Sequence, residues 1–195
     1  MATAPTQSVW PDRVRLPLRF DPAPLAADLA ALERGDWTEH FVRQNYEGEW
    51  SVLPLRASAA ARHPVQMIYS APDATEFVDT PWRARMPGLS AVIDAFQSPV
   101  RSVRLMRLAA GSMIKEHEDL DLDVADGFAR IHVPVVTNPD VDFRLNGERV
   151  TMAPGEAWYL RLADPHSVAN RGDTARVHLV LDMVADDWLL RQLEG

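Results

Sequence analysis

Hydrophobic and polar positions alternate in short runs through the second half of the chain, from about residue 100 to 184. Turn residues separate these runs about every ten positions, which is typical of antiparallel strands in a sandwich or small barrel, a jelly roll among them. The strands that this pattern predicts lie at 103–108, 130–136, 141–152 (a hairpin with its turn at Asn146-Gly147), 156–162, 166–170 and 174–183.

Helical spacing of apolar residues is confined to three short stretches. After a strand expected at 13–20, Pro22 begins a helix that Gly35 can end. A second helix is expected over 89–97 and a third, near the end of the chain, over 186–193. The fold is therefore predicted to be mainly β, with its helices before and after the strands.

The residues between the first two helices have a different composition. The segment 37–56 is dense in aromatic and polar side chains, with a turn at 46–50. We interpret it as a packed cover on one end of the domain rather than as a direct substrate contact. Residues 57–87 predict a long irregular connection of the kind that can form a lid. We expect one structural domain, in which residues 1–98 form a lead-in that packs on a core at 99–195.

Composition narrows the classes of protein that fit this pattern. With 195 residues, of which 47% are hydrophobic, the chain is long enough to bury a substantial core. Its formal net charge of −8 argues against nucleic acid as a partner. It contains no cysteine, which excludes disulfides, a thiol nucleophile and cysteine metal sites. Since neither a signal-peptide pattern nor a membrane-spanning apolar run is evident, we expect a cytoplasmic protein without a membrane partner.

The candidate chemistry starts at His117 and Asp119, which would point to one side of an extended strand. They supply two of the three ligands of the facial triad in non-haem iron enzymes, which needs a second histidine. His166 is our candidate because it begins a strand after a proline turn, where a ligand can reach the mouth of a barrel. His132 and His178 lie inside apolar runs, where histidines are more often hydrogen-bonded core residues.

The predicted hairpin places a further group beside His166. A three-residue loop at 171–173 would pair Val168 with Arg176 and His166 with His178, so that His166, Arg176 and His178 share one face. An arginine there can hold the far carboxylate of an iron-bound 2-oxo acid, because a guanidinium binds a carboxylate through two hydrogen bonds and keeps its charge. Taken alone, Arg176 has a surface position as its alternative.

Taken together, these residues resemble the aspartyl/asparaginyl β-hydroxylase group of 2-oxoglutarate- and iron(II)-dependent oxygenases, including its small bacterial members and the related proline cis-3-hydroxylase. The resemblance covers about 99–183, and 37–56 is similar to the N-terminal part of the bacterial members. The stretches that carry it are 104–112, 117–119, 130–134, 154–160, 166–172 and 176–182.

The resemblance implies a double-stranded β-helix, which is a jelly-roll, cupin-like fold, as the oxygenase core at 99–195. An N-terminal helical and irregular elaboration and a short C-terminal helix would complete it. The site residues that it implies are the iron ligands His117, Asp119 and His166 and the co-substrate contacts Arg176, Arg130 and His132. Arg130 and His132 lie two positions apart in one predicted strand, so they face the same way.

At three positions the chain differs from the animal enzyme of this group. That enzyme lacks the acidic ligand, so Asp119 restores a full triad, as in the proline hydroxylase branch. A serine that contacts the co-substrate there corresponds to Met106 in this chain. Arg104 falls where the animal enzyme has a lysine near the substrate. We therefore expect Arg104 to bind a substrate carboxylate, with a surface position as the alternative.

The activity that the resemblance implies is hydroxylation of an unactivated C–H bond in an amino acid or a peptidyl amino-acid side chain, coupled to conversion of 2-oxoglutarate to succinate and CO2. The cofactors would be Fe(II) and 2-oxoglutarate, and the partner a small-molecule or peptide substrate; a homodimer is left open. One alternative is a cupin-type isomerase or lyase, which uses another metal and has no need of Arg176. The other is a non-catalytic cupin that binds a small molecule.

Overall fold

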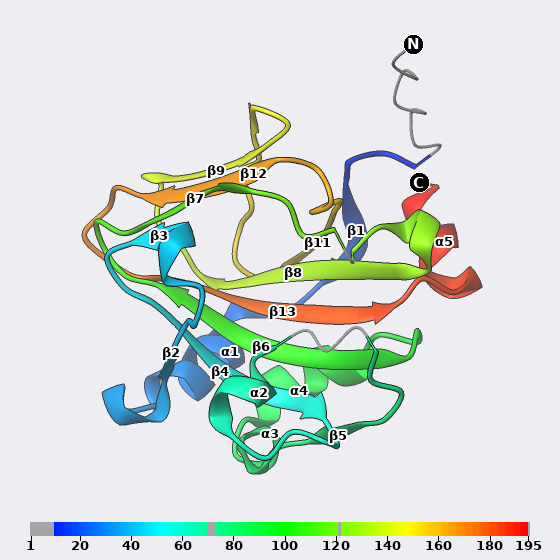
Figure 1. Cartoon of the computed structure of the whole chain (residues 1–195), viewed down its shortest axis with the longest axis horizontal. Helices are drawn as coiled ribbons and strands as arrows, with labels where there is room; N and C mark the ends of the chain where they lie inside the picture. Colours follow the sequence, from blue (N-terminus) through cyan, green and yellow to red (C-terminus); the bar gives the residue numbers. More distant parts are fainter. Residues whose placement is uncertain (1–9, 70–72, 121, 195) are drawn as a thin grey trace.

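Two antiparallel sheets face each other in the computed structural model, which describes residues 10–69, 73–120 and 122–194 (Figure 1). The larger sheet runs in the order β1 (Arg13–Arg19), β11 (Glu156–Leu160), β8 (Phe128–Val136), β13 (Arg176–Val184), β6 (Val100–Leu108), β4 (Trp50–Ser58) and β2 (Thr38–Glu39), with β5 (Phe77–Asp79) paired to β4. The smaller sheet runs in the order β10 (Glu148–Arg149), β9 (Val141–Leu145), β12 (His166–Asn170), β7 (Met113–His117) and β3 (Tyr46–Glu47). The mainly β, jelly-roll architecture expected from the sequence is confirmed.

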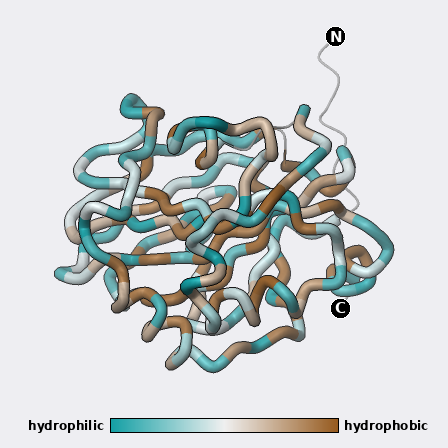
Figure 2. The backbone as a smooth tube through the Cα atoms, turned by 90° about the horizontal axis from the view of Figure 1, so that it is seen from below, coloured by the Kyte–Doolittle hydropathy of each residue, from teal (hydrophilic) through white to brown (hydrophobic). Residues whose placement is uncertain are grey.

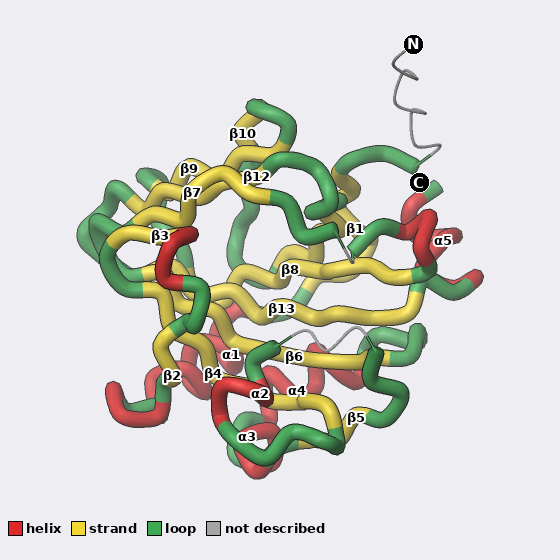
Figure 3. The backbone as a smooth tube through the Cα atoms, viewed as in Figure 1, coloured by secondary structure: helices red, strands yellow, loops and turns green. Residues whose placement is uncertain are grey.

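Short helices pack against the larger sheet on the side away from the smaller one (Figure 3), except for the helix at 64–67, whose following residue Ile68 packs in the apolar cluster between the two sheets. The helical elements are α1 (Pro22–Ala30), α2 (Pro64–Met67), α3 (Pro81–Ala84), α4 (Pro87–Asp94) and α5 (Asp187–Leu193), with 3-10 turns at Arg34–Asp36, Arg43–Asn45 and Val124–Asp126. α1 packs on α4, and the buried carboxylate of Asp28 joins them by accepting a hydrogen bond from the main-chain N–H of Leu89 at 2.8 Å. None of the described helices is both long and apolar enough to cross a membrane.

Alternate residues of the central strands belong to two different apolar clusters. In β13, Leu179 packs in the cluster between the larger sheet and the helices, whereas Val180 packs in the cluster between the two sheets. Because side chains alternate along a strand, Arg176, His178 and Asp182 lie on the same face as Val180, toward the smaller sheet. Figure 2 shows hydrophobic and hydrophilic stretches following one another along the backbone through the middle of the molecule. The buried polar residues of β13 are therefore placed inside the sandwich by strand periodicity alone.

The expected hairpin between 166–170 and 174–183 is wrong. β12 pairs with β7 and β9 in the smaller sheet, whereas β13 pairs with β8 and β6 in the larger sheet. The chain crosses between the sheets instead of turning back. The buried amide of Asn170 stabilises this crossing by donating hydrogen bonds to the main-chain oxygens of Leu108 (3.1 Å) and Thr174 (2.8 Å). His166 and Arg176 consequently belong to opposite sheets and not to one face of a hairpin.

Most other predicted elements are present with shifted ends. The hairpin at 141–152 turns at Asn146 and Gly147, whose φ angles of 52° and 78° are both positive, as its two-residue turn requires. The first helix ends at Ala30, and Gly35 lies within the separate 3-10 turn Arg34–Asp36 instead of at the end of the helix. The segment 57–87, expected to be irregular, contains α2, β5 and α3 within its described residues.

Residues before 99, expected to pack on the core as a lead-in, also supply strands to it. β4 pairs with β6 over Trp50↔Leu108 to Arg56↔Val103, and β1 pairs with β11 at the other edge of the larger sheet. β3 extends the smaller sheet. This first part of the chain thus helps to form both walls of the interior in which the candidate site lies.

Candidate metal centre and active site

Three of the predicted ligands converge at one end of the smaller sheet. His117 is the last residue of β7 and His166 is the first residue of β12, where the two residues are direct cross-strand partners. Asp119 follows just beyond β7, where its main-chain N–H donates a 2.7 Å hydrogen bond to the oxygen of Leu162. One ligand atom from each of the three residues lies within 4.8 Å of the others. The strand pairing therefore brings the two imidazoles together, and the segment after β7 brings the carboxylate of Asp119 close to them.

Both histidines are oriented by main-chain carbonyl groups. The Nδ1 atom of His117 lies 2.8 Å from the oxygen of Lys115, and the Nδ1 atom of His166 lies 3.0 Å from the oxygen of Asp164. A carbonyl can only accept, so each Nδ1 carries the hydrogen and each Nε2 keeps a free lone pair. Burial and the neighbouring His117 lower the pKa of His166 to about 4, so its ring is neutral near neutral pH. Neutral Nε2 atoms are what a metal ion requires.

The carboxylate of Asp119 divides its two oxygens between two neighbours. Oδ2 accepts a 2.6 Å hydrogen bond from Nη1 of Arg130, and Oδ1 lies 3.9 Å from Nε2 of His117. One oxygen therefore remains on the side of the histidines. Two imidazole nitrogens and one carboxylate oxygen form the donor set of the facial triad, and they fit an iron(II) ion.

Arg176 is a buried cation without an acidic partner among the described residues. Its Nη2 lies 2.8 Å from Nδ1 of His178, its Nε has no hydrogen-bond partner, and its guanidinium lies 5.9 Å from the ring centroid of Phe143. Burial lowers the pKa of Arg176 to about 9. An unpaired charge inside a protein is costly, so this arrangement calls for an anionic ligand.

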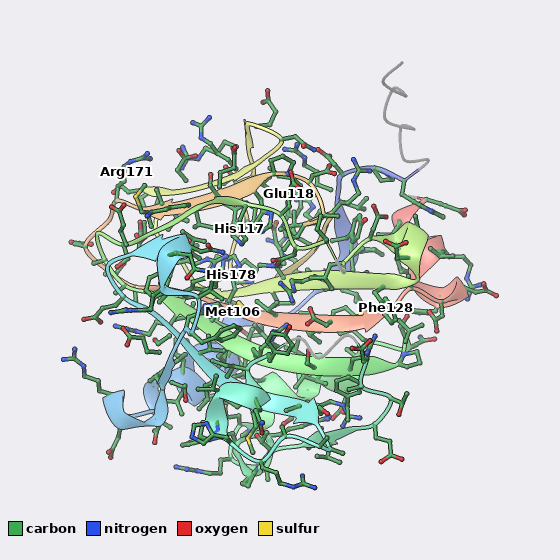
Figure 4. All side chains as sticks on the ribbon, viewed as in Figure 1. Met106, His117, Glu118, Phe128, Arg171 and His178 are labelled. Carbon is green, nitrogen blue, oxygen red and sulfur yellow. The ribbon has the colours of Figure 1, made fainter. Side chains whose placement is uncertain are left out.

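His132 lies beside this cation. Its Nδ1 atom is 3.2 Å from Nδ1 of His178, while its Nε2 atom is buried without a partner. Burial, followed by the charge of Arg176, lowers the pKa of both rings well below the ordinary value. Figure 4 shows His178 and Met106 on the larger sheet and His117 on the smaller one. His132 lines the same cavity as Arg176 and the three ligands, whereas His178 does not line it.

Arg104 and Arg130 are buried, which excludes the surface position considered for Arg104. Both pair with Asp182, which sequence reasoning missed. Nε and Nη2 of Arg130 donate to this carboxylate at 2.6 and 3.1 Å, and Nη2 of Arg104 donates to its Oδ2. Although burial opposes ionisation, the charges of Arg104 and Arg130 hold the pKa of Asp182 well below its usual range. The sequence did contain a signal for Asp182. It lies an even number of positions from Arg176 and His178 in an otherwise apolar strand, so the three side chains share one face.

The cavity that these residues line has a volume of about 230 Å³ and an aromatic rim. His40 stacks on Trp50 with ring centroids 3.6 Å apart, and Phe41 lies 5.7 Å from Tyr69. All four side chains line the cavity. The segment 37–56, interpreted from sequence as a cover, therefore also forms part of the wall. Its density of aromatic residues was the only sequence signal for this role, and a packed cover has the same composition.

The charges at the cavity do not cancel. Among the lining residues, Arg104, Arg130 and Arg176 contribute three positive charges and Asp119 contributes one negative charge. Asp182 does not line the cavity, but it pairs with Arg104 and Arg130 and contributes a second negative charge, which leaves one net positive charge. The remaining lining residues are uncharged or are histidines. The exposed Glu118 is not among them. The site therefore favours anionic ligands.

The chain is similar to known proteins along most of its length. It matches the aspartyl/asparaginyl β-hydroxylase family over residues 24–186. An L-proline cis-4-hydroxylase from Rhizobium meliloti (strain 1021) is 28% identical over 172 residues, which are 86% of this chain and 59% of that protein. The chain thus spans less than two thirds of that relative's length.

Solved structures share the fold at low sequence identity. An oxidoreductase of the 2OG-Fe(II) oxygenase family from Burkholderia pseudomallei superposes with a TM-score of 0.54 at 17% identity, over 90% of this chain and 86% of that one. HygX from Streptomyces hygroscopicus, with nickel and 2-oxoglutarate bound, gives a TM-score of 0.52 at 15% identity, over 88% of this chain and 82% of that one. These likenesses place the jelly-roll fold among those of oxygenases.

Proposed function

Because the chain belongs to the aspartyl/asparaginyl β-hydroxylase family, we propose that it is an iron(II)- and 2-oxoglutarate-dependent oxygenase. Its reaction hydroxylates an unactivated C–H bond of an amino acid or a peptidyl amino-acid side chain. One observation carries this proposal: the buried Arg176, which has no acidic partner within the described part of the chain, lines the same cavity as the three candidate ligands. A metal site and a fixed cation within one cavity suit a dicarboxylate that binds metal at one end.

Each side chain has a defined task in this proposal. His117, Asp119 and His166 hold the iron on one face and leave the other face open to ligands. Arg176 neutralises the far carboxylate of 2-oxoglutarate, which supplies the anion that its burial requires. When bound, iron and 2-oxoglutarate supply the oxidising chemistry, in which dioxygen and 2-oxoglutarate yield succinate, CO2 and the substrate hydroxyl group. The buried apolar wall, which includes Phe143, limits water at the reacting centre.

Charge points to a substrate with one carboxylate. Iron(II) adds two positive charges and 2-oxoglutarate two negative charges, so the net positive charge of the cavity is unchanged when both bind. Arg104 lines the cavity and its Nε atom has no partner, which makes it our candidate for the substrate contact. The relative described as an L-proline cis-4-hydroxylase is in keeping with an amino-acid substrate.

A cupin-type isomerase or lyase is the alternative from another enzyme class. Such an enzyme would use the three ligands but would have no need of a buried cation at Arg176. The two proposals differ in their product, because only the oxygenase releases succinate from 2-oxoglutarate.

The test is to supply the purified protein with Fe(II), ascorbate and 2-oxoglutarate and to screen free amino acids, their methyl esters and short peptides. We expect succinate formation and a product heavier by one oxygen atom, with methyl esters poorer than the free acids. The matched control is His166→Ala under the same conditions. Isomerised product without succinate would establish the alternative, and equal turnover by the control would remove the metal site from the mechanism.

A further inference from the structure

Asp182 is a buried carboxylate at the centre of a chain of charges that ends at the metal ligands. It lies in β13 directly opposite Arg130 of β8. Its Oδ1 accepts from Nε of Arg130 at 2.6 Å, and its Oδ2 accepts from Nη2 of Arg130 at 3.1 Å, from Oγ of Ser102 at 2.8 Å and from Arg104. Asp182 itself does not line the cavity. Any effect it has on the site must therefore act through its neighbours.

Arg130 links Asp182 to the candidate ligand Asp119 by hydrogen bonds to both carboxylates. All three of its guanidinium nitrogens donate to carboxylates: Nε and Nη2 to Asp182, and Nη1 to Oδ2 of Asp119 at 2.6 Å. A guanidinium is planar and rigid, so two bonds to one carboxylate fix the direction of the third. Asp119 would otherwise be free to rotate, since its side chain retains 31% exposure beyond the end of β7.

We propose that Asp182 is a positioning residue for the metal centre. By fixing Arg130 it holds Oδ2 of Asp119 on Nη1 and leaves Oδ1 facing His117 and the metal. The inference rests on the proposed iron site and assigns no contact between Asp182 and the ion. Ligands held by outer groups bind metal more tightly, because less side-chain freedom is lost on binding.

A purely structural ion pair does not explain this geometry. Burial of a charge cluster contributes little or nothing to stability compared with apolar packing, so stability alone gives no reason for this arrangement. The two arginines that pair with Asp182 can be compared with each other, because only Arg130 also pairs with Asp119. A positioning role predicts that the two arginines differ in their effect on metal binding.

The test measures the affinity of the full-length protein for Ni(II), as a stand-in for iron, by titration calorimetry without 2-oxoglutarate or substrate. We expect Asp182→Asn to weaken Ni(II) binding about 10- to 100-fold, the range for outer-sphere partners of metal ligands. Arg104→Gln is the matched control, because it removes the other cation on the same carboxylate; its Ni(II) affinity should not fall. Equal weakening in both variants would overturn the proposal.

A double-mutant cycle separates positioning from the loss of a nearby negative charge. In an Asp119→Ala background, Asp182→Asn should have little further effect on Ni(II) affinity, because the ligand that it positions is gone. A loss as large as in the wild type would show that Asp182 acts by charge or by general stability, which contradicts the proposal. Thermal unfolding of each variant checks that the fold is intact.

If the Asp182→Asn variant does not fold, the Arg130→Lys variant tests the same positioning role. A lysine keeps the charge but cannot bridge two carboxylates in a fixed geometry, so Ni(II) binding should weaken as it does for Asp182→Asn. Wild-type affinity in a folded Arg130→Lys protein would refute the positioning role. These measurements involve no turnover, so a failure to detect succinate would affect the proposed function and leave this result separate.

Discussion

His166 lies directly opposite His117 across β12 and β7, and their ring centroids are 4.2 Å apart. The main-chain ladder of the smaller sheet therefore sets the spacing of two candidate metal ligands. Only Asp119, which lies beyond the end of β7, depends on side-chain contacts for its position. Substitutions at the candidate ligands and at the residues around them should therefore have different effects.

Replacement of Asp119 by alanine should abolish iron-dependent turnover while leaving the fold intact. The side chain is partly exposed and pairs with a single arginine, so its loss removes little packing. Succinate formation should fall at least about 100-fold, since even partners of metal ligands cost 10- to 100-fold when removed. The measurement is succinate release beside thermal unfolding. Unaltered turnover would show that Asp119 is not a ligand.

Arg176→Ala should raise the KM for 2-oxoglutarate without changing Ni(II) affinity. Removal of a charged partner from a buried pair costs about 2 kcal/mol or more, which corresponds to a KM at least about 30-fold higher. Initial rates against 2-oxoglutarate concentration provide the measurement, and Arg171→Ala, which removes an exposed arginine, is the matched control. An unchanged KM would exclude Arg176 from co-substrate binding.

The same buried cation should destabilise the protein when 2-oxoglutarate is absent. Arg176→Met replaces an unpaired charge by an apolar side chain of similar length, so the free energy of unfolding should rise by about 1 kcal/mol or more. Added 2-oxoglutarate should raise the Tm of the metal-loaded wild type but not that of the variant. A variant less stable than the ligand-free wild type would mean that Arg176 is satisfied without an anion.

His178 should matter for stability and not for metal binding. It does not line the cavity, and it contacts Arg176 and His132. His178→Gln leaves buried polar groups imperfectly paired, which costs about 1–3 kcal/mol of unfolding free energy. Chemical denaturation measures this cost, and Ni(II) titration of the same sample should match the wild type. Loss of metal binding would make His178 the third ligand in place of His166.

Stability should fall as pH decreases through the range in which free histidines titrate. Burial lowers the pKa of His40 and of His166 to about 4 from an ordinary value of 6.5, and it lowers those of His132 and His178 as well. Between these values the folded state binds fewer protons than the unfolded chain, so the free energy of unfolding rises with pH across this window. Denaturation of the metal-free protein at several pH values measures the slope.

His40→Gln provides the control for this pH dependence. It removes one titrating ring that is not a candidate ligand, so the slope should become smaller but remain positive. A flat profile for the wild type across the window would contradict the burial of neutral histidines in the folded state.

The positions of most strands, and the placement of His117 and Asp119 on one side of the chain, could be predicted because both depend on residues close in sequence. Alternation along β8 also predicted that Arg130 and His132 share a face. Strand partners could not be predicted in the same way. We expected His166 and Arg176 to meet on one hairpin, and they meet instead across the interior, because consecutive strands β12 and β13 pair in different sheets.

By itself the sequence determined the mainly β pattern, the candidate ligands and the candidate anion anchor, since periodicity, turn residues and side-chain chemistry are local properties. Only the tertiary structure decided which partners those groups have. Arg104 and Arg130 carry the same charge in the sequence, yet Arg130 alone reaches both Asp182 and Asp119. Of the three arginines that line the cavity, Arg176 alone is left without a carboxylate partner among the described residues. Burial and pairing depend on residues distant in the chain, and the free energy of a charge depends on both.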